Sequence, residues 1–250
     1  MKIVFDIGGS KLRVSASRDG NSLSSPVIVP TPKDPAIAVE RLISTARDLA
    51  EGTTISVIAG GVAGVLNPER TALIAAGNLP RWVGFNFAEV LQDKLKCDVK
   101  LANDAALGAL GEANYGAGQG FHKILYYTIG TGVGGTWVVN GQLPAKGVFE
   151  PGHQIVDWHQ GTTLEQLVDQ AATAREQVHY IALGLLNSLL HWPADIIILG
   201  GGKTIHKTWT VEQVRTQLLN LAHNYITVPK LVFAKLGDMA GLYGALHLSK

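Results

Sequence analysis

The sequence predicts an α/β fold, because β-rich apolar runs alternate with helix-like segments along most of the chain. Three glycine-rich turns, at residues 6–11, 130–135 and 200–202, each follow such a run directly. The 250 residues are 46% hydrophobic and 16% charged, which is typical of a globular protein with a well-buried core. This length can form either one large domain or two lobes.

The first half is expected to open with a hairpin and a helix. Residues 2–5 form a strand that ends at the first glycine turn, and apolar residues then alternate with polar ones over 12–16, as in a half-buried strand. Asp34 and Pro35 mark the start of a helix that Gly52 ends. The other elements expected here are a buried strand at 55–59, a helix at 86–96, a strand at 99–101 and a helix at 104–115.

The second half is expected to start after a loop at 116–120. A strand at 124–129 enters the second glycine turn and continues as a strand at 136–139, where Asn140 and Gly141 mark a tight turn. A long helix is expected at 163–190 and a buried strand at 195–199.

Charge and composition exclude several classes of protein. The 21 basic and 20 acidic side chains are scattered, so neither nucleic acid nor an anionic membrane is an expected partner. The apolar runs fall short of the roughly 18 residues that a membrane span needs, and Asp6 interrupts the opening run, so no secretory signal is expected. The lone Cys97 excludes internal disulfides and cysteine-cluster metal sites. We therefore expect a cytoplasmic protein that acts on a small polar molecule.

The three glycine turns favour a nucleotide-binding cleft. Backbone without side chains lets several N–H groups converge on phosphate oxygens. A single turn of this kind is more often an ordinary end to a strand, so the inference rests on all three. None matches the P-loop pattern, and the β-branched run after residue 135 is unlike the helix that follows a dinucleotide fingerprint.

Several polar residues allow both a structural and a functional interpretation. Asn103 and Asp104 suit a helix cap, or Asp104 accepts a proton from an attacking hydroxyl that Asn103 orients. Asp6 either caps the hairpin turn or holds magnesium, directly or through water. Thr162 and Glu165 have the spacing of a capping box. The remaining candidates, His153, His179, His191 and His206, lack metal-ligand spacing and are expected to be structural or exposed.

Taken in order, these segments resemble the ROK family of bacterial sugar kinases and sugar-responsive repressors over nearly the whole chain. The motifs that carry the resemblance are Asp-Ile-Gly-Gly-Ser-Lys at 6–11, Gly-Asn-Leu-Pro-Arg-Trp at 77–82, Leu-Ala-Asn-Asp-Ala-Ala at 101–106, Thr-Ile-Gly-Thr-Gly-Val-Gly-Gly at 128–135, Glu-Pro-Gly-His at 150–153, Leu-Glu at 164–165, Ile-Leu-Gly-Gly-Gly at 198–202 and Asp-Met-Ala-Gly-Leu-Tyr-Gly-Ala at 238–245.

The resemblance implies an actin-like ATPase fold, related to ribonuclease H, with a cleft between two lobes. The small lobe would span 1–117, with a C-terminal helix at 238–250 packing back on it, and the large lobe 118–237. Such a protein transfers the terminal phosphoryl group of ATP, with Mg²⁺, to a hexose hydroxyl, most simply the 6-hydroxyl of glucose or a close relative. A homodimer is implied as well.

The resemblance also assigns roles to individual residues. Asp104 corresponds to the catalytic base and Asp6 to the magnesium-holding carboxylate. The residues that would bind the hexose are Asn78, Asn103, Glu150, His153 and Glu165. Those that would bind the nucleotide phosphates are Asp6, Gly8, Gly9, Lys11, Thr131, Gly132 and Gly134, and those beside the adenosine are Gly201 and Gly202.

The sequence departs from the family pattern in one place. The family's cysteine-rich zinc motif is missing, since only eleven residues separate His153 from Glu165, so no zinc is expected. This short form and residues 192–202 are also similar to polyphosphate glucokinases, which leaves the phosphoryl donor open.

Two other functions remain as alternatives. The first is a sugar-sensing protein without turnover. The family's repressors carry a helix-turn-helix ahead of the first glycine turn, which begins here at Asp6, so the enzyme is favoured. The second is an actin-like assembly ATPase, which does not explain Asn78, Glu150 and Glu165.

Overall fold

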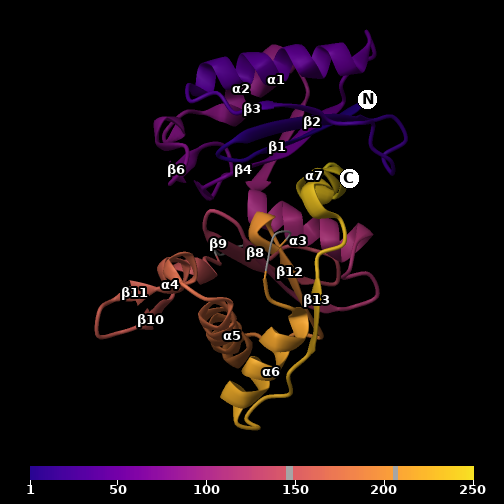
Figure 1. Cartoon of the computed structure of the whole chain (residues 1–250). Coiled ribbons are helices and arrows are strands. Elements are labelled where there is room, and N and C mark those ends of the chain that lie inside the picture. Colours follow the sequence, from indigo (N-terminus) through magenta and orange to yellow (C-terminus); the bar gives the residue numbers. More distant parts are fainter. Residues whose placement is uncertain (145–148, 205–207) are drawn as a thin grey trace. The chain divides into compact units, whose positions relative to one another are not determined.

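A computed structural model describes residues 1–144, 149–204 and 208–250. His206, for which the sequence predicts a structural or exposed role, lies outside the described residues. The chain divides into two compact units, Met1–Gly111 with Met239–Lys250, and Glu112–Asp238 (Figure 1). Each unit has its own sheet and hydrophobic core. The lobe bounds expected from the sequence stay a prediction.

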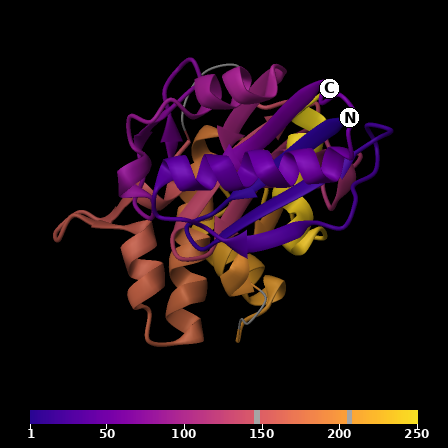
Figure 2. The same cartoon turned by 90° about the horizontal axis from the view of Figure 1, so that it is seen from above.

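Unit 1 is built on a five-stranded sheet in the order β3-β2-β1-β4-β7. The antiparallel strands β1, β2 and β3 join a parallel set made of β1, β4 and β7. Helices α1 and α2 cover one face of this sheet and α7 the other (Figures 1 and 2). The strands are β1 (Lys2–Ile7), β2 (Lys11–Ser17), β3 (Val27–Pro30), β4 (Val57–Val62) and β7 (Asp98–Asn103), and the helices are α1 (Pro35–Ala50), α2 (Phe87–Leu95) and α7 (Ala240–Leu248).

Local chemistry explains where the elements of unit 1 begin and end. The Asp34 carboxylate accepts the Ala36 N–H at 2.9 Å and so caps α1, and Glu51 ends this helix in the left-handed conformation, with φ of 49°. Asn86 caps α2 in the same way. Helix α3 (Asp104–Tyr115) follows β7 directly and has the expected bounds. The predicted hairpin and these three helices are confirmed, whereas the buried strand predicted at 55–59 is β4 and lies further along the chain, at Val57–Val62.

A small ribbon and a short helix complete unit 1. Strands β5 (Val65–Leu66) and β6 (Leu73–Ala75) pair antiparallel, and the 3-10 helix η1 (Pro80–Trp82) follows them. Leu79 and Trp82 are buried, which fixes the segment that carries Asn78.

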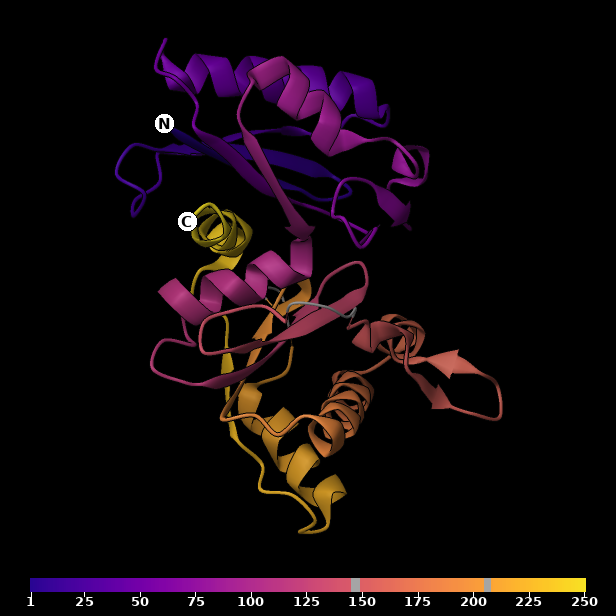
Figure 3. The ribbon, with the colours of Figure 1, turned by 180° about the vertical axis from the view of Figure 1, so that it is seen from behind.

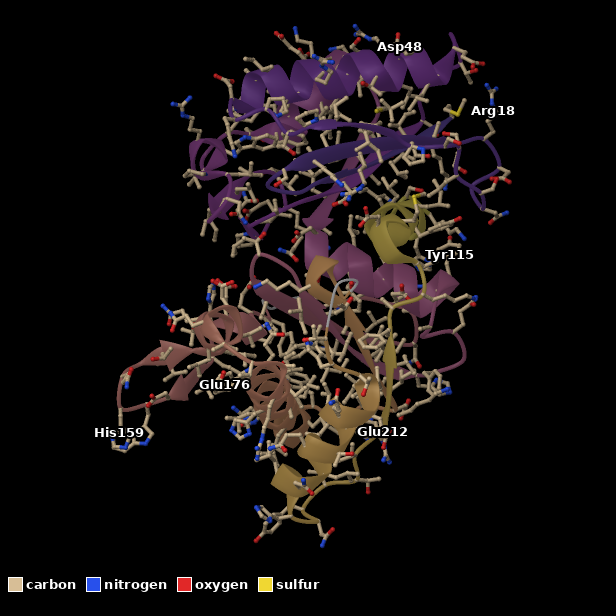
Figure 4. The ribbon with its side chains drawn as sticks, in the orientation of Figure 1. Arg18, Asp48, Tyr115, His159, Glu176 and Glu212 are labelled. Carbon is tan, nitrogen blue, oxygen red and sulfur yellow. The ribbon has the colours of Figure 1, made fainter. Side chains whose placement is uncertain are left out.

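Unit 2 contains a four-stranded sheet in the order β13-β12-β8-β9. Strand β12 is parallel to β8 and β13, whereas β8 and β9 form an antiparallel hairpin. Helices α5 and α6 pack side by side, and the hairpin of β10 and β11 extends away from them, with His159 in its loop (Figures 3 and 4). The strands are β8 (Lys123–Ile129), β9 (Val133–Val139), β10 (Ile155–Asp157), β11 (Thr162–Thr163), β12 (Ile196–Gly200) and β13 (Lys230–Phe233), and the helices are α4 (Leu164–Gln170), α5 (Ala174–His191) and α6 (Val211–Ala222), with the 3-10 helices η2 (Pro151–His153), η3 (Gly202–Thr204) and η4 (Gly237–Met239).

The single long helix predicted at 163–190 is wrong. The chain leaves the helix after Gln170, and Thr173 starts α5 with a capping box in which Glu176 is the reciprocal partner. The apolar pattern continues across this break because both helices bury one face on the same core, so periodicity alone did not reveal it. Among the described residues, no helix combines the length and apolar character needed to cross a membrane.

Candidate active site

The first glycine turn joins β1 to β2 and is held by backbone hydrogen bonds. The Gly8 N–H donates to the Lys11 carbonyl at 2.9 Å. Buried Thr31, at the end of β3, donates its hydroxyl to the Gly8 carbonyl at 2.7 Å and its N–H to the Ser10 carbonyl at 3.0 Å. Thr31 thus fixes the turn from outside, a role that sequence reasoning missed.

Asn78 lies directly against this turn. A Cβ atom on Gly9 would lie 2.7 Å from the Asn78 Cβ, so only glycine allows this approach. Two segments far apart in sequence, the first glycine turn and the predicted hexose-binding segment, therefore touch within unit 1.

Asp6 ends up in β1 rather than in the turn, opposite Arg13 on β2. Its carboxylate forms an ion pair with the Arg13 guanidinium at 3.3 Å, and both side chains are largely buried. Gly241, near the start of α7, packs against the same carboxylate. Asp6 is therefore held in one orientation by neighbours on β2 and α7.

Asn103 and Asp104 lie where β7 ends and α3 begins. The Asn103 Oδ1 accepts the N–H groups of Ala105 at 2.9 Å and Ala106 at 3.2 Å, which caps α3, while its Nδ2 donates to the Gly64 carbonyl at 2.9 Å. The Asp104 Oδ1 accepts the Ala105 N–H at 2.9 Å. Burial raises the pKa of the Asp104 carboxyl above its usual value, and the Ala105 N–H opposes that rise. A carboxylate with a raised pKa suits a general base.

The second glycine turn joins β8 to β9 and is closed by a hydrogen bond from the Gly130 N–H to the Gly132 carbonyl at 2.8 Å. The Glu165 carboxylate accepts the Val133 N–H at 2.9 Å. A Cβ on Gly132 would overlap this carboxylate, so the missing side chain makes room for it. Thr131 is exposed and Gly134 lies at the start of β9.

The predicted capping box of Thr162 and Glu165 is wrong by one residue. The cap of α4 is made by Thr163 and Gln166, whose side chains bond reciprocally to the two ends of the first turn. Glu165 is therefore the second residue of the helix, one position before Gln166, and its carboxylate faces the second glycine turn. Glu165 therefore has no capping role.

The Glu150 to His153 segment forms the tight turn η2 beside the same glycine turn. Gly152 packs on the Val133 carbonyl and lies near the Glu165 carboxylate, and the His153 N–H donates to the Glu150 carbonyl at 3.1 Å. Glu150 is half-buried and His153 is exposed. The structure thus brings three predicted site segments together in unit 2.

The third glycine turn follows β12. Gly201 has a φ of 91° and packs on the backbone of Ile129, so the third turn contacts the end of the strand that leads into the second turn. A Cβ on Gly202 would meet nothing within 4 Å, so this residue leaves open space. The next residue, Lys203, forms an ion pair with Asp169 of α4 at 2.7 Å.

In the described ranges, no three His, Cys, Asp or Glu side chains come close enough to one another to hold a metal ion. A single carboxylate can still serve Mg²⁺, which keeps several water ligands and binds through substrate phosphates. Asp6 fits that limited role because its carboxylate is already oriented.

The order of strands and the glycine turns define the actin-like ATPase fold, and solved structures agree. A ROK hexokinase from Thermus thermophilus superimposes with a TM-score of 0.83 at 26% identity, over 99% of this chain and 97% of the other. A ROK glucokinase from Streptomyces griseus, in complex with glucose and AMPPNP, gives a TM-score of 0.83 at 21% identity, over 99% and 98%.

Sequence comparison agrees with the fold. The ROK family model matches residues 2–166, so the chain belongs to the ROK family. A glucokinase from Streptomyces coelicolor is 24% identical over 311 aligned positions, covering 100% of this chain and 98% of the relative. The family resemblance predicted from the motifs is confirmed.

Proposed function

We propose that this ROK-family sugar kinase transfers the terminal phosphoryl group of ATP to the 6-hydroxyl of glucose or a closely related hexose. One observation carries the proposal: in each unit, a predicted phosphate turn touches a predicted hexose residue. These pairs are Gly9 with Asn78 and the Gly132–Val133 backbone with Glu165. Contact of this kind suits a reaction in which the acceptor hydroxyl must lie beside the transferred phosphoryl group.

Asp104 accepts the proton of the attacking hydroxyl in this mechanism. Its raised pKa makes it a stronger base than an exposed aspartate. The hexose hydroxyls bind to the two asparagines, the two glutamates and His153 that the sequence identified. The carboxylates of Glu150 and Glu165 accept hydrogen bonds that a deoxy sugar lacks.

The nucleotide binds to the glycine turns. Backbone N–H groups of the first two turns, with Lys11 and Thr131, hold the phosphates, and Gly201 and Gly202 lie beside the adenosine. Asp6 would hold Mg²⁺, directly or through water, and the ion would supply positive charge to the phosphate oxygens. No zinc takes part. We also propose a cytoplasmic homodimer, as the family resemblance implies.

Hexose-dependent formation of sugar phosphate tests this function. The purified protein should phosphorylate at least one hexose with ATP and magnesium, without added zinc. The screen should cover glucose, fructose, mannose and their N-acetylated relatives, each with ATP and with polyphosphate, because residues 192–202 resemble polyphosphate glucokinases. Activity with polyphosphate and none with ATP would show that polyphosphate, rather than ATP, is the phosphoryl donor. Hexose binding without turnover on either donor would favour the sugar-sensing alternative.

A methyl group on Gly9 should weaken hexose binding. Because the added Cβ would lie 2.7 Å from the Asn78 Cβ, Gly9→Ala must displace the turn or Asn78. We expect the hexose KM to rise about tenfold or more, since small misplacements at an active site are costly. Gly77→Ala is the matched control, because a Cβ there would meet nothing within 4 Å. Steady-state kinetics on both variants gives the comparison, and an unchanged hexose KM in Gly9→Ala would refute the contact's role.

A further inference from the structure

Gln154 directly follows the predicted hexose-binding turn and makes an extensive set of side-chain contacts. Its Nε2 donates to the Pro151 carbonyl at 2.8 Å and contacts the Tyr127 hydroxyl at 3.4 Å. Its Oε1 accepts from the Asn187 Nδ2 at 2.9 Å. One amide thus ties the turn Pro151–His153 to strand β8 and helix α5.

The Tyr127 hydroxyl that Gln154 contacts is itself held by hydrogen bonds. The Tyr127 hydroxyl is buried and donates to the Gly184 carbonyl at 3.0 Å, with Ser188 Oγ at 2.6 Å. Burial raises the pKa of Tyr127 to about 12, so this hydroxyl stays protonated at neutral pH. The Gln154 side chain therefore contacts a neutral hydroxyl group that hydrogen bonds between β8 and α5 hold in place.

The backbone of Gln154 reaches the second hexose-side segment. Its carbonyl accepts the Leu164 N–H at 2.9 Å, one residue before Glu165. The chain between these residues forms the hairpin of β10 and β11, which extends away from the helices (Figure 4). Gln154 lies at the base of this hairpin, where both of its ends meet unit 2.

We propose that Gln154 is a positioning residue that holds the Glu150–His153 turn and Glu165 in one fixed arrangement for hexose binding. The proposal rests on the function proposed above. The side-chain amide fixes the turn, and the backbone carbonyl fixes the start of α4. Gln154 acts through these neighbours and does not touch the sugar.

Gln154→Met tests the side-chain part, because methionine keeps the length and loses the hydrogen bonds. Gln177→Met is the matched control: Gln177 lies in the first turn of α5, and its Oε1 accepts from the Trp209 Nε1 at 3.1 Å. We expect Gln154→Met to raise the hexose KM about tenfold, with the ATP KM changed less than twofold, because several hydrogen bonds are lost. Gln177→Met should lower the thermal midpoint comparably and change neither KM. Asn187→Ala, which removes one partner only, should raise the hexose KM less than Gln154→Met.

Hydrogen exchange on the ligand-free protein provides a readout that does not depend on activity. Peptides over residues 150–165 should exchange faster in Gln154→Met than in wild type or Gln177→Met. Unchanged exchange, an unchanged hexose KM, or equal rises in both KM values would overturn the positioning role. A wild-type protein without activity on any hexose would instead overturn the proposed function, with the exchange result still deciding the role of Gln154.

Discussion

Replacing Asp104 by asparagine is expected to lower kcat by about 10²- to 10⁴-fold in a protein that still folds. Folding should survive because Asn103 caps α3, and an asparagine oxygen at position 104 can still accept the Ala105 N–H. The amide cannot take a proton from the hexose hydroxyl. Hexose affinity should therefore change far less than turnover.

The pH dependence gives a second check on the same residue. Burial raises the pKa of Asp104, so in the wild type kcat/KM should fall, as the pH drops, at a pH above the roughly 3.9 of an exposed aspartate. Asp104→Asn should lack this acid limb. The matched control is Asp98→Asn, which makes the same change at an exposed position on β7 and should leave kcat unchanged. Near-normal turnover of Asp104→Asn on the best hexose would show that Asp104 is only a structural residue.

Removing the Glu165 carboxylate is expected to weaken the binding of both the hexose and the nucleotide. Glu165→Ala leaves the Val133 N–H without its acceptor and removes a proposed hexose ligand. Hydrogen bonds to a charged group contribute about 1.5–3 kcal/mol each, so kcat/KM for the hexose should fall by about 10²-fold. Calorimetric titration with AMPPNP should show weaker nucleotide binding as well, because the second glycine turn is no longer fixed.

Two further variants separate these effects. Glu165→Gln keeps an oxygen for the Val133 N–H, so nucleotide affinity should be retained while hexose affinity falls. Glu176→Ala removes a carboxylate of the same unit that serves the cap of α5, so it should lower stability without changing either KM. Equal nucleotide affinities in Glu165→Ala and the wild type would contradict a role for Glu165 in holding the turn.

Much of the fold and the identity of the site segments could be predicted because they depend on local chemistry. Asp34 with Pro35, and Asn86, mark helix starts by side-chain capping that requires only neighbouring residues. The glycine turns likewise follow strands whose composition is visible in the sequence. Asn140 and Gly141 both adopt positive φ, as a tight hairpin turn requires.

The rest depends on contacts between distant segments, which no local pattern reveals. The role of Thr31 arises from its position beside the first glycine turn, and that of Gln154 from partners on β8 and α5. The sequence does not distinguish two positions for the capping box of α4, because both Thr162 and Thr163 have a suitable partner three positions on. Only the structure shows that Glu165 faces the glycine turn instead.

Phosphorus NMR of the reaction with ATP, magnesium and the best hexose tests the central proposal most directly. The account predicts a new phosphate-ester resonance coupled to the two protons on C6 of the sugar. This ester should form in a one-to-one ratio with ADP. In Asp104→Asn, its rate of formation should fall by the same factor as kcat. ATP cleaved to ADP and free phosphate with no sugar ester, or an ester at another carbon, would contradict it.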